Sequence, residues 1–227
     1  MILPIVRREL SPVMLSSQLH PVIDSIYRGR QVSHTDDLEN GLKGLTHYKA
    51  LKGIETAAAL LADSVEQNKR IIIVGDFDAD GATSIAVCLL SMGLMGFNNI
   101  DYLVPNRFDF GYGLSVPIVD VAIERNADGI VTVDNGISCI DGVTHAKEKG
   151  LEVIVTDHHL PGDTLPPADA IVNPNQPGCT FPSKNLAGVG VSFYIMLAIK
   201  AELQQRGYFE RSGVVPPNLA TLLDIVA

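Results

Sequence analysis

The sequence of 227 residues contains little cysteine and no apolar run long enough to cross a membrane. Its three cysteines, Cys88, Cys139 and Cys179, lie far apart and form no Cys-x-x-Cys pair. This usage argues against disulfide bonds and structural zinc and is typical of the reducing cytoplasm. A membrane span needs about 18 consecutive apolar residues, and the amino terminus lacks the long apolar core of a signal peptide. We therefore expect a cytoplasmic protein that has no membrane partner.

Basic residues are also scarce. The chain has 17 Lys and Arg against 26 Asp and Glu, which gives a formal net charge of −9. Bulk electrostatics of this sign oppose binding to nucleic acid. Any nucleic-acid site must therefore be a local basic patch or belong to a part of the protein outside this sequence. Apolar residues make up 46 % of the chain, which is ample for a hydrophobic core.

From Arg70 onward, short apolar runs alternate with helical patterns. The predicted strands are 70–75, 100–104, 129–133, 152–156 and 170–173, and the predicted helices lie near 82–95, 116–126, 138–149 and 189–206. Strands separated by helices of this length predict right-handed βαβ units and a parallel sheet. We therefore expect a doubly wound α/β domain over 70–227, preceded by a helical amino-terminal arm over 1–69. Within that arm, 21–27, 36–42 and 54–66 have helical apolar spacing.

Three aspartates alternate directly after the first predicted strand. Asp76, Asp78 and Asp80 follow the run 70–74, so they lie at the carboxyl end of a buried parallel strand. Open α/β sheets bind their ligands at that edge. Carboxylates crowded together resist ionisation unless a cation or protons compensate their charge. The pattern therefore favours a hard divalent ion with oxygen ligands, Mg²⁺ or Mn²⁺.

Two other interpretations of this segment exist. Asp-x-Asp-x-Asp-Gly also opens a calcium loop of the EF-hand type, which requires Glu at its twelfth position. Counting from Asp76, that position is Val87, which cannot ligate a metal, and the segment follows a strand rather than a helix. A solvated acidic turn without metal is the second alternative.

Two further predicted strands end in potential metal ligands. Asp134 follows the strand 129–133, and Asp157, His158 and His159 follow the next one. Carboxylate and imidazole ligands together suit a two-metal site, with ions ~3.5–4 Å apart. Adjacent residues on an extended segment point to opposite sides. We therefore expect one histidine to ligate metal and the other to face the substrate or a neighbouring carboxylate.

These motifs resemble a known family. Asp78-Ala-Asp80-Gly81, Val133-Asp134-Asn135-Gly136 and Asp157-His158-His159 look like motifs I to III of the DHH phosphoesterase superfamily. The Asp-x-Asp-x-Asp opening and the stretches 104–115, 156–165 and 186–190 are similar to its RecJ branch of single-strand-specific exonucleases. The resemblance covers about residues 50–227. It implies hydrolysis of single-stranded DNA from the 5′ end, with release of 5′-mononucleotides in DNA repair and recombination.

The resemblance also implies roles for individual residues. The expected ligands of two Mn²⁺ or Mg²⁺ ions are Asp78, Asp80, Asp134 and His158, with Asp134 as the bridging carboxylate. Asp76 and Asp157 are weaker candidates, either behind the metal ligands or hydrogen-bonded to the backbone. His159 would face the scissile phosphate as an electrophile or an acid, and with Arg107 it would stabilise the charge that develops on the phosphoryl oxygens.

Three further features add substrate contacts to this expectation. Arg107 and Tyr112, in the loop after a predicted strand, are candidates for phosphate contact and base stacking. Gly188 and Gly190 open a helix whose amides are candidates for holding a phosphate.

The resemblance names single-stranded DNA, a single-strand-binding protein and a helicase as partners. RecJ proteins carry a fourth-motif aspartate that would follow Ala227, and further domains after it. The segment 218–227 begins like a helix and stops on apolar residues without a cap. We therefore expect a fragment that folds, binds metal weakly and has little activity.

Two alternative functions remain from the sequence. One is a phosphodiesterase of the same superfamily that acts on short oligonucleotides or nucleotide second messengers. The other is a non-catalytic DHH module that only binds nucleic acid or protein.

Overall fold

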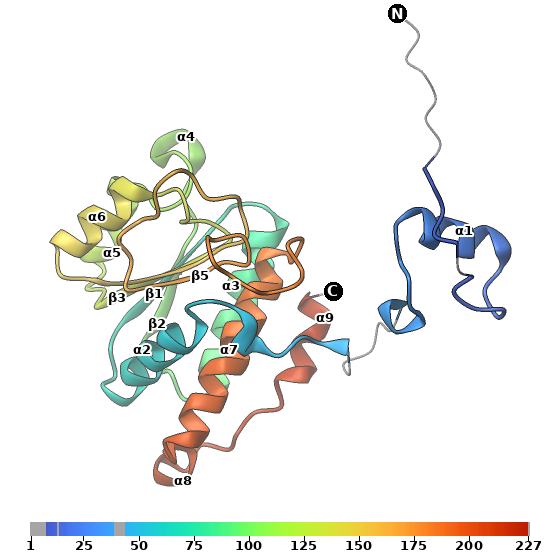
Figure 1. Cartoon of the computed structure of the whole chain (residues 1–227). Helices are drawn as coiled ribbons and strands as arrows, with labels where there is room; N and C mark the ends of the chain where they lie inside the picture. The colour runs from blue at the N-terminus through green and yellow to red at the C-terminus, as the bar shows by residue number, and fades with distance from the viewer. Residues whose placement is uncertain (1–7, 13, 39–43, 227) are drawn as a thin grey trace, which may run out of the picture. The chain divides into compact units, whose positions relative to one another are not determined.

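The structure, a computed structural model, describes residues 8–12, 14–38 and 44–226, without the side chain of Arg107. The chain divides into two compact units, Met1–Thr46 and His47–Ala227, which are described separately (Figure 1). Among the described residues, no helix combines the length and the apolar character that a membrane crossing needs.

The first unit contains the helix α1 (Pro21–Gly29) and the short 3-10 helix η1 (Thr35–Leu38). Proline at the first position of α1 suits a helix start, because the missing N–H would have no partner there. Asp24 is buried in this unit, where it accepts the Leu15 N–H and pairs with Arg28 one turn later. The helix expected over 36–42 is therefore a 3-10 turn as far as Leu38, and 39–43 lie outside the described residues.

The second unit is built on a five-stranded sheet in the order β2-β1-β3-β4-β5, with every pair parallel. Its strands are β1 (Ile71–Gly75), β2 (Ile100–Leu103), β3 (Gly129–Val133), β4 (Glu152–Thr156) and β5 (Ala170–Val172). The five predicted strands are confirmed to within a residue at each end. Their apolar, β-branched runs read as buried strands because a parallel sheet is covered on both faces.

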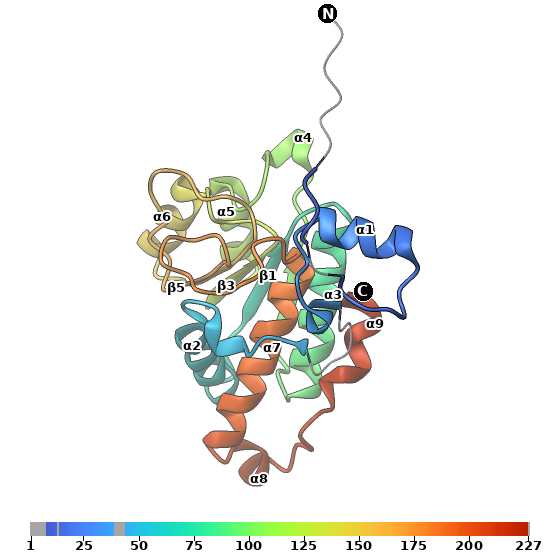
Figure 2. The same cartoon turned by 45° about the vertical axis from the view of Figure 1, so that its right-hand side comes forward.

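Helices cover both faces of this sheet (Figures 1 and 2). One layer consists of α2 (Ile54–Glu66), α3 (Ala79–Leu94) and α7 (Gly188–Gln205), and the other of α5 (Val116–Glu124) and α6 (Ile140–Glu148). Alternate residues of β1 enter the two cores, with Ile71 and Ile73 on one side and Ile72 and Val74 on the other. Each such buried side chain contributes about 1.5–3 kcal/mol of transfer free energy. The expected doubly wound α/β fold is confirmed.

The boundary between the units differs from the expected one at 69/70. Helix α2 belongs to the second unit, because Ile54 and Leu61 are fully buried in the core that it shares with α7. Its entry is fitted closely to β5. Gly53 has a left-handed backbone (φ +81°), and a β-carbon there would lie 2.2 Å from the Ile171 carbonyl oxygen.

Short elements complete the unit: the 3-10 helices η3 (Tyr48–Ala50) and η4 (Leu219–Leu222), and the helices α4 (Arg107–Phe110), α8 (Tyr208–Ser212) and α9 (Leu223–Val226). The strand order 2-1-3-4-5 reverses direction between β1 and β3. In doubly wound folds of this order, ligands bind outside the carboxyl ends of the strands at that switch point. The fold therefore directs attention to the residues that follow β1 and β3.

Candidate metal centre

Three aspartates lie side by side where β1, β3 and β4 end. The register pairs Gly75 with Val133 and Val133 with Thr156. The next residue of each strand, Asp76, Asp134 or Asp157, therefore leaves the sheet at the same level. All three are at least 95 % buried, with exposed fractions of 5 %, 2 % and 1 %. Carboxylates concentrated in this way need compensating charge or protons.

Asp134 occupies the most constrained position in this row. Its backbone is left-handed (φ +60°), a conformation that Asp adopts more readily than most residues. Burial, followed by the nearby Asp80 and Asp78 carboxylates, raises the pKa of Asp134 to about 8. Its Oδ1 atom is buried and has no hydrogen-bond partner among the described residues. A buried carboxylate oxygen without a donor is an atom that a cation would satisfy.

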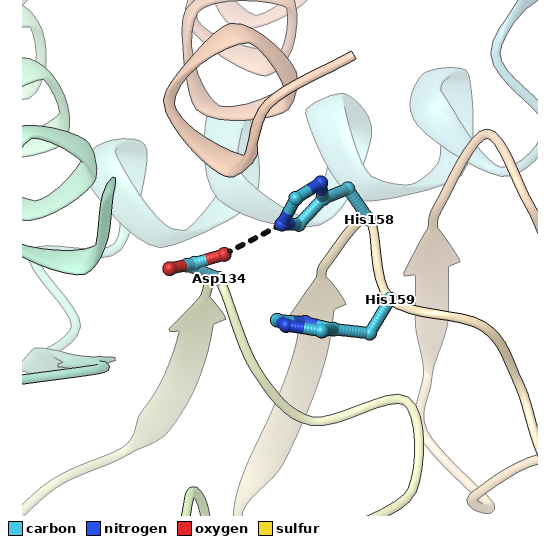
Figure 3. Close-up of side chains that lie close together, drawn as sticks. All are labelled: Asp134, His158 and His159. Carbon is cyan, nitrogen blue, oxygen red and sulfur yellow. Dashed lines mark ion pairs between the residues drawn. The ribbon is translucent and has the colours of Figure 1, made fainter. Parts of the chain in front are cut away.

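His158 points at Asp134 from the segment after β4 (Figure 3). Its Nε2 atom lies 3.1 Å from Asp134 Oδ1 and 3.6 Å from Asp80 Oδ2. The first pair is close enough for an ion pair but is not aligned as a hydrogen bond. His158 Nε2 and the two carboxylate oxygens thus converge without a hydrogen bond between them. Nitrogen and oxygen donors of this kind suit Mn²⁺ or Mg²⁺.

Asp80 has a second task besides facing His158. Its Oδ2 accepts the Gly188 N–H at 2.8 Å and its Oδ1 accepts the Val189 N–H at 2.7 Å. These are the first amides of α7, which have no partner inside the helix and lie at the positive end of its dipole. Asp80 therefore joins the start of α3 to the start of α7 and keeps its carboxylate beside Asp134.

Two groups of potential ligands meet at Asp134. In one, atoms of Asp134, His158 and His159 all lie within 4.8 Å of one another, and in the other the same holds for Asp76, Asp78 and Asp134. Asp78 also caps α3 by accepting the Gly81 N–H at 2.9 Å. Because Asp134 belongs to both groups, its carboxylate is the one that two cations would share if each group held one.

Asp157 holds His159 rather than taking part in either group. One of its oxygens, Oδ1, accepts from the backbone N–H of His158 and His159 and from His159 Nδ1 at 2.7 Å, while Oδ2 accepts the Ile137 N–H. Burial alone would raise the pKa of Asp157, but these hydrogen bonds outweigh it and the pKa is lowered. The same contact raises the pKa of His159 to about 9, so its ring carries a proton at neutral pH. Asp157 is thus confirmed as a backbone-bonded carboxylate.

The expectation that the two histidines point to opposite sides is wrong. Their ring centroids lie 4.7 Å apart, and both rings face the Asp134 side of the site (Figure 3). The extended conformation ends at Asp157, because its side chain gathers the next two backbone amides and turns the chain. The two rings still have different partners, since His158 faces Asp134 and Asp80 whereas His159 is bonded to Asp157.

The structure places the expected substrate contacts unevenly. Tyr112 lies edge-on to His159 with ring centroids 6.3 Å apart, and partial burial, with Asp76 and Asp157 nearby, raises its pKa. Arg107 begins α4, but its side chain lies outside the described residues. The Gly188 N–H is already bonded to Asp80, and Gly190 is packed against Leu186. Substrate roles for these residues stay predictions.

Sequence reasoning missed three asparagines that support the site. Asn135 donates to the Val74 and Val133 carbonyls and so joins the ends of β1 and β3. Asn173 and Asn175 donate to the backbone carbonyls of the two histidines, at 3.0 Å for His159 and 2.6 Å for His158. For Asn173 and Asn175 the available signal was the run Asn-Pro-Asn at the end of the fifth predicted strand, since polar residues there face the same sheet edge.

Comparison with known families and proteins agrees with this geometry. The model of the DHH family, N-terminal domain, matches residues 70–225. The single-stranded-DNA-specific exonuclease RecJ of Haemophilus influenzae is 52 % identical over 221 residues, and RecJ of Escherichia coli is 53 % identical over 222 residues. Each alignment covers 97 % of this chain and 38 % of the relative. The chain thus spans well under half the length of these curated relatives.

Solved structures give the same picture. A crystal structure of exonuclease RecJ bound to manganese is similar with a TM-score of 0.61 and 36 % identity, over 74 % of this chain and 40 % of that one. RecJ of Thermus thermophilus in complex with Mn²⁺ has a TM-score of 0.63 and 34 % identity, over 84 % of this chain and 25 % of that one.

Proposed function

The chain belongs to the DHH family, and from that membership and the geometry of its acidic sheet edge we propose that it hydrolyses phosphodiester bonds of single-stranded DNA with Mn²⁺ or Mg²⁺ as cofactor. The observation that carries the proposal is the buried Oδ1 of Asp134, which has no hydrogen-bond donor and lies between two groups of ligand atoms. The similarity to RecJ exonucleases supports the choice of substrate.

We assign the metal-holding role to Asp134, with His158 and Asp80 on one side of it and Asp76 and Asp78 on the other. When bound, divalent ions neutralise phosphate charge and lower the pKa of a water molecule toward neutrality.

His159 is the proposed proton donor. Its ring is protonated at neutral pH, because Asp157 accepts from Nδ1 and raises the pKa of the histidine to about 9. Nε2 is then the atom that donates to a phosphate oxygen or to the 3′-oxygen that leaves. Asp157 acts through this ring: it fixes the ring orientation and the proton on Nδ1.

The family resemblance extends the proposal to polarity and context. We propose digestion from the 5′ end, release of 5′-mononucleotides, a cytoplasmic location, and cooperation with a single-strand-binding protein and a helicase. Single strands labelled at either end test the polarity, because a 5′ exonuclease releases a 5′ label first. A length series tests the substrate class, because a phosphodiesterase for small nucleotides would favour the shortest oligomers.

The central experiment is Mn²⁺ calorimetry on the chain and on Asp134→Asn, followed by hydrolysis of labelled single strands with protein in excess. Asn tolerates the left-handed backbone but removes the charge. We expect weak Mn²⁺ binding and slow cleavage by the unaltered chain, and loss of both in the variant. Asp163→Ala is the matched control, because it removes an exposed aspartate from a loop. Equal Mn²⁺ binding by all three proteins would refute the proposed site.

A further inference from the structure

A pocket of about 400 Å³ opens directly beside the candidate metal centre. Tyr112, Cys139 and His159 line it, together with Gly136, Ile137, Ser138 and Asp157. Its volume falls within the ~300–1,000 Å³ that is typical of pockets for small organic ligands. Because the His159 ring forms part of its wall, a molecule in this pocket would lie against the proposed proton donor.

The charge of the wall excludes one class of ligand. Among the described residues that line the pocket there is no lysine or arginine, and the surface that they expose is mostly apolar. The only acidic group among these lining residues is Asp157, whose carboxylate accepts hydrogen bonds from the His159 ring and the Ile137 backbone. Among the described side chains of the wall, a phosphate would therefore meet a carboxylate and no lysine or arginine. A neutral, flat and largely apolar group suits the wall better.

The exposed Tyr112 ring indicates that the neutral, flat group is a nucleobase. Tyr112 is 48 % exposed, and its ring stands perpendicular to that of His159, with centroids 6.3 Å apart. Burial raises the pKa of the Tyr112 phenol and of the Cys139 thiol, so both stay uncharged. Exposed aromatic rings in single-strand-binding sites act as stacking platforms for bases, each stack contributing about 1–3 kcal/mol.

We propose that this pocket binds the nucleobase and deoxyribose of the nucleotide next to the scissile phosphate, with the base stacked on Tyr112 between the loop 111–115 and the start of α6. The inference rests on the proposed function, because it takes the scissile phosphate to lie at the metal centre. The proposal assigns Ile137, Ser138 and Cys139 to substrate binding. The phosphate would lie at the metal centre, and the largely apolar pocket would bind the nucleoside.

The chain contains no tryptophan, which makes a direct test available. In Tyr112→Trp, the new indole would be the only one in the protein and would report on stacking by a loss of emission. The probes are deoxyadenosine, which is neutral and has a base, and 2-deoxyribose, which has none. Titration in EDTA removes metal and hydrolysis from the experiment. Val215→Trp is the control, since Val215 is 81 % exposed in the segment after α8.

We expect deoxyadenosine to quench Tyr112→Trp saturably, 2-deoxyribose to leave its emission unchanged, and neither to affect Val215→Trp. Equal quenching by the two probes, or equal response of the two variants, would overturn the assignment. Absence of quenching, in a protein whose unaltered form binds Mn²⁺, would overturn the nucleoside pocket and leave the proposed function intact. Failure of the unaltered chain to bind Mn²⁺ would overturn both.

A second variant tests the pocket without altering Tyr112. Ser138 is exposed at the rim, so Ser138→Phe fills the pocket without burying a polar group. It should weaken binding of single-stranded DNA by about tenfold or more, the loss expected for one stacked base, and leave Mn²⁺ binding unchanged. Glu148→Phe, at the exposed last residue of α6, is its matched control and should bind DNA normally. Equal DNA affinity of Ser138→Phe and the control would also refute the pocket.

Discussion

Replacing Gly188 with alanine is the sharpest test of how the metal centre is held. A β-carbon at this position would lie 2.5 Å from Oδ1 of Asp134 and 2.8 Å from its Cβ and Cγ. Carbon atoms pack at about 3.5 Å or more, so the new methyl group would overlap Asp134 by about 0.7 Å. Relief requires movement of Asp134 or of the first turn of α7. The second route disturbs Asp80, which holds the Gly188 and Val189 amides.

The expected magnitudes follow from this overlap. Overpacking of a buried site costs about 1–3 kcal/mol, and alanine recovers about 0.4–1 kcal/mol because it restricts the unfolded chain. Gly188→Ala should therefore lower the free energy of unfolding by about 1–2 kcal/mol in EDTA. It should also weaken Mn²⁺ binding by about 10–100-fold, the range seen when the support of a metal ligand is removed. Urea unfolding and calorimetry measure the two effects separately.

Two other glycines serve as matched controls. Gly93 is exposed in α3, and a β-carbon there meets nothing within 4 Å, so Gly93→Ala should stabilise the fold by about 0.5–1 kcal/mol. At Gly190 the three atoms nearest to an added β-carbon all belong to the Leu186 side chain, so Gly190→Ala should leave Mn²⁺ binding unchanged. If Gly188→Ala binds Mn²⁺ like the unaltered chain and is as stable as Gly93→Ala, the close packing of α7 on Asp134 has no role in metal binding.

Three further predictions concern charge. The pKa of Asp134 is raised to about 8 in the fold, above its ordinary value of 3.8, so the metal-free fold should lose stability as pH rises from 4 to 8. Urea unfolding of Asp134→Asn should show no such fall in stability with pH, and an equal fall in both proteins would contradict the assignment. Asp157→Asn should lower the pKa of His159 from about 9 toward its ordinary value, as followed by NMR titration without metal, and an unchanged value would mean that Asp157 does not hold the proton. Arg206 pairs with acidic side chains of α2 and α7, so Arg206→Ala should lower the free energy of unfolding by about 1 kcal/mol or less. In urea unfolding this difference should shrink at high salt, and Mn²⁺ affinity should not change.

The parallel sheet and the approximate place of the site were predictable from the sequence. Strands such as 71–75 and 129–133 are runs of mostly apolar, β-branched residues, and their carboxyl ends must meet at one edge once the sheet is parallel. Asp76, Asp134 and Asp157 each follow such a run directly, so their proximity follows from the register alone. The motif resemblance then added roles that spacing alone does not give.

The remaining features depend on tertiary contacts between distant residues. Asp80 bonds the amides of Gly188 and Val189, more than 100 residues away, and this contact exists only because α3 packs against α7. The turn at Asp157 depends on its own side chain, which ends the strand and brings the two histidine rings together. Helix α2 shows helical spacing in the sequence, but its membership of the second unit depends on the face that it buries against α7.

Asp134 combines several features that are unfavourable for the stability of the fold. Its backbone is left-handed, a conformation that costs a non-glycine residue about 1–2 kcal/mol. Its carboxylate is buried, its pKa is raised to about 8, and its Oδ1 lacks a donor among the described residues. Gly188 packs so closely against it that a β-carbon there would lie 2.5 Å from Oδ1.

The cost of the buried carboxylate would fall in the presence of a cation, because positive charge stabilises the ionised form and occupies the oxygen that lacks a donor. Strain and unsatisfied polar atoms concentrated at one residue are typical of functional sites, where local structure is stabilised by its surroundings. Asp76 and Asp157, at the same level of the sheet, each have a hydrogen-bond donor, and neither has the left-handed backbone of Asp134. The contrast between these neighbours and Asp134 supports the proposal that Asp134 holds the metal.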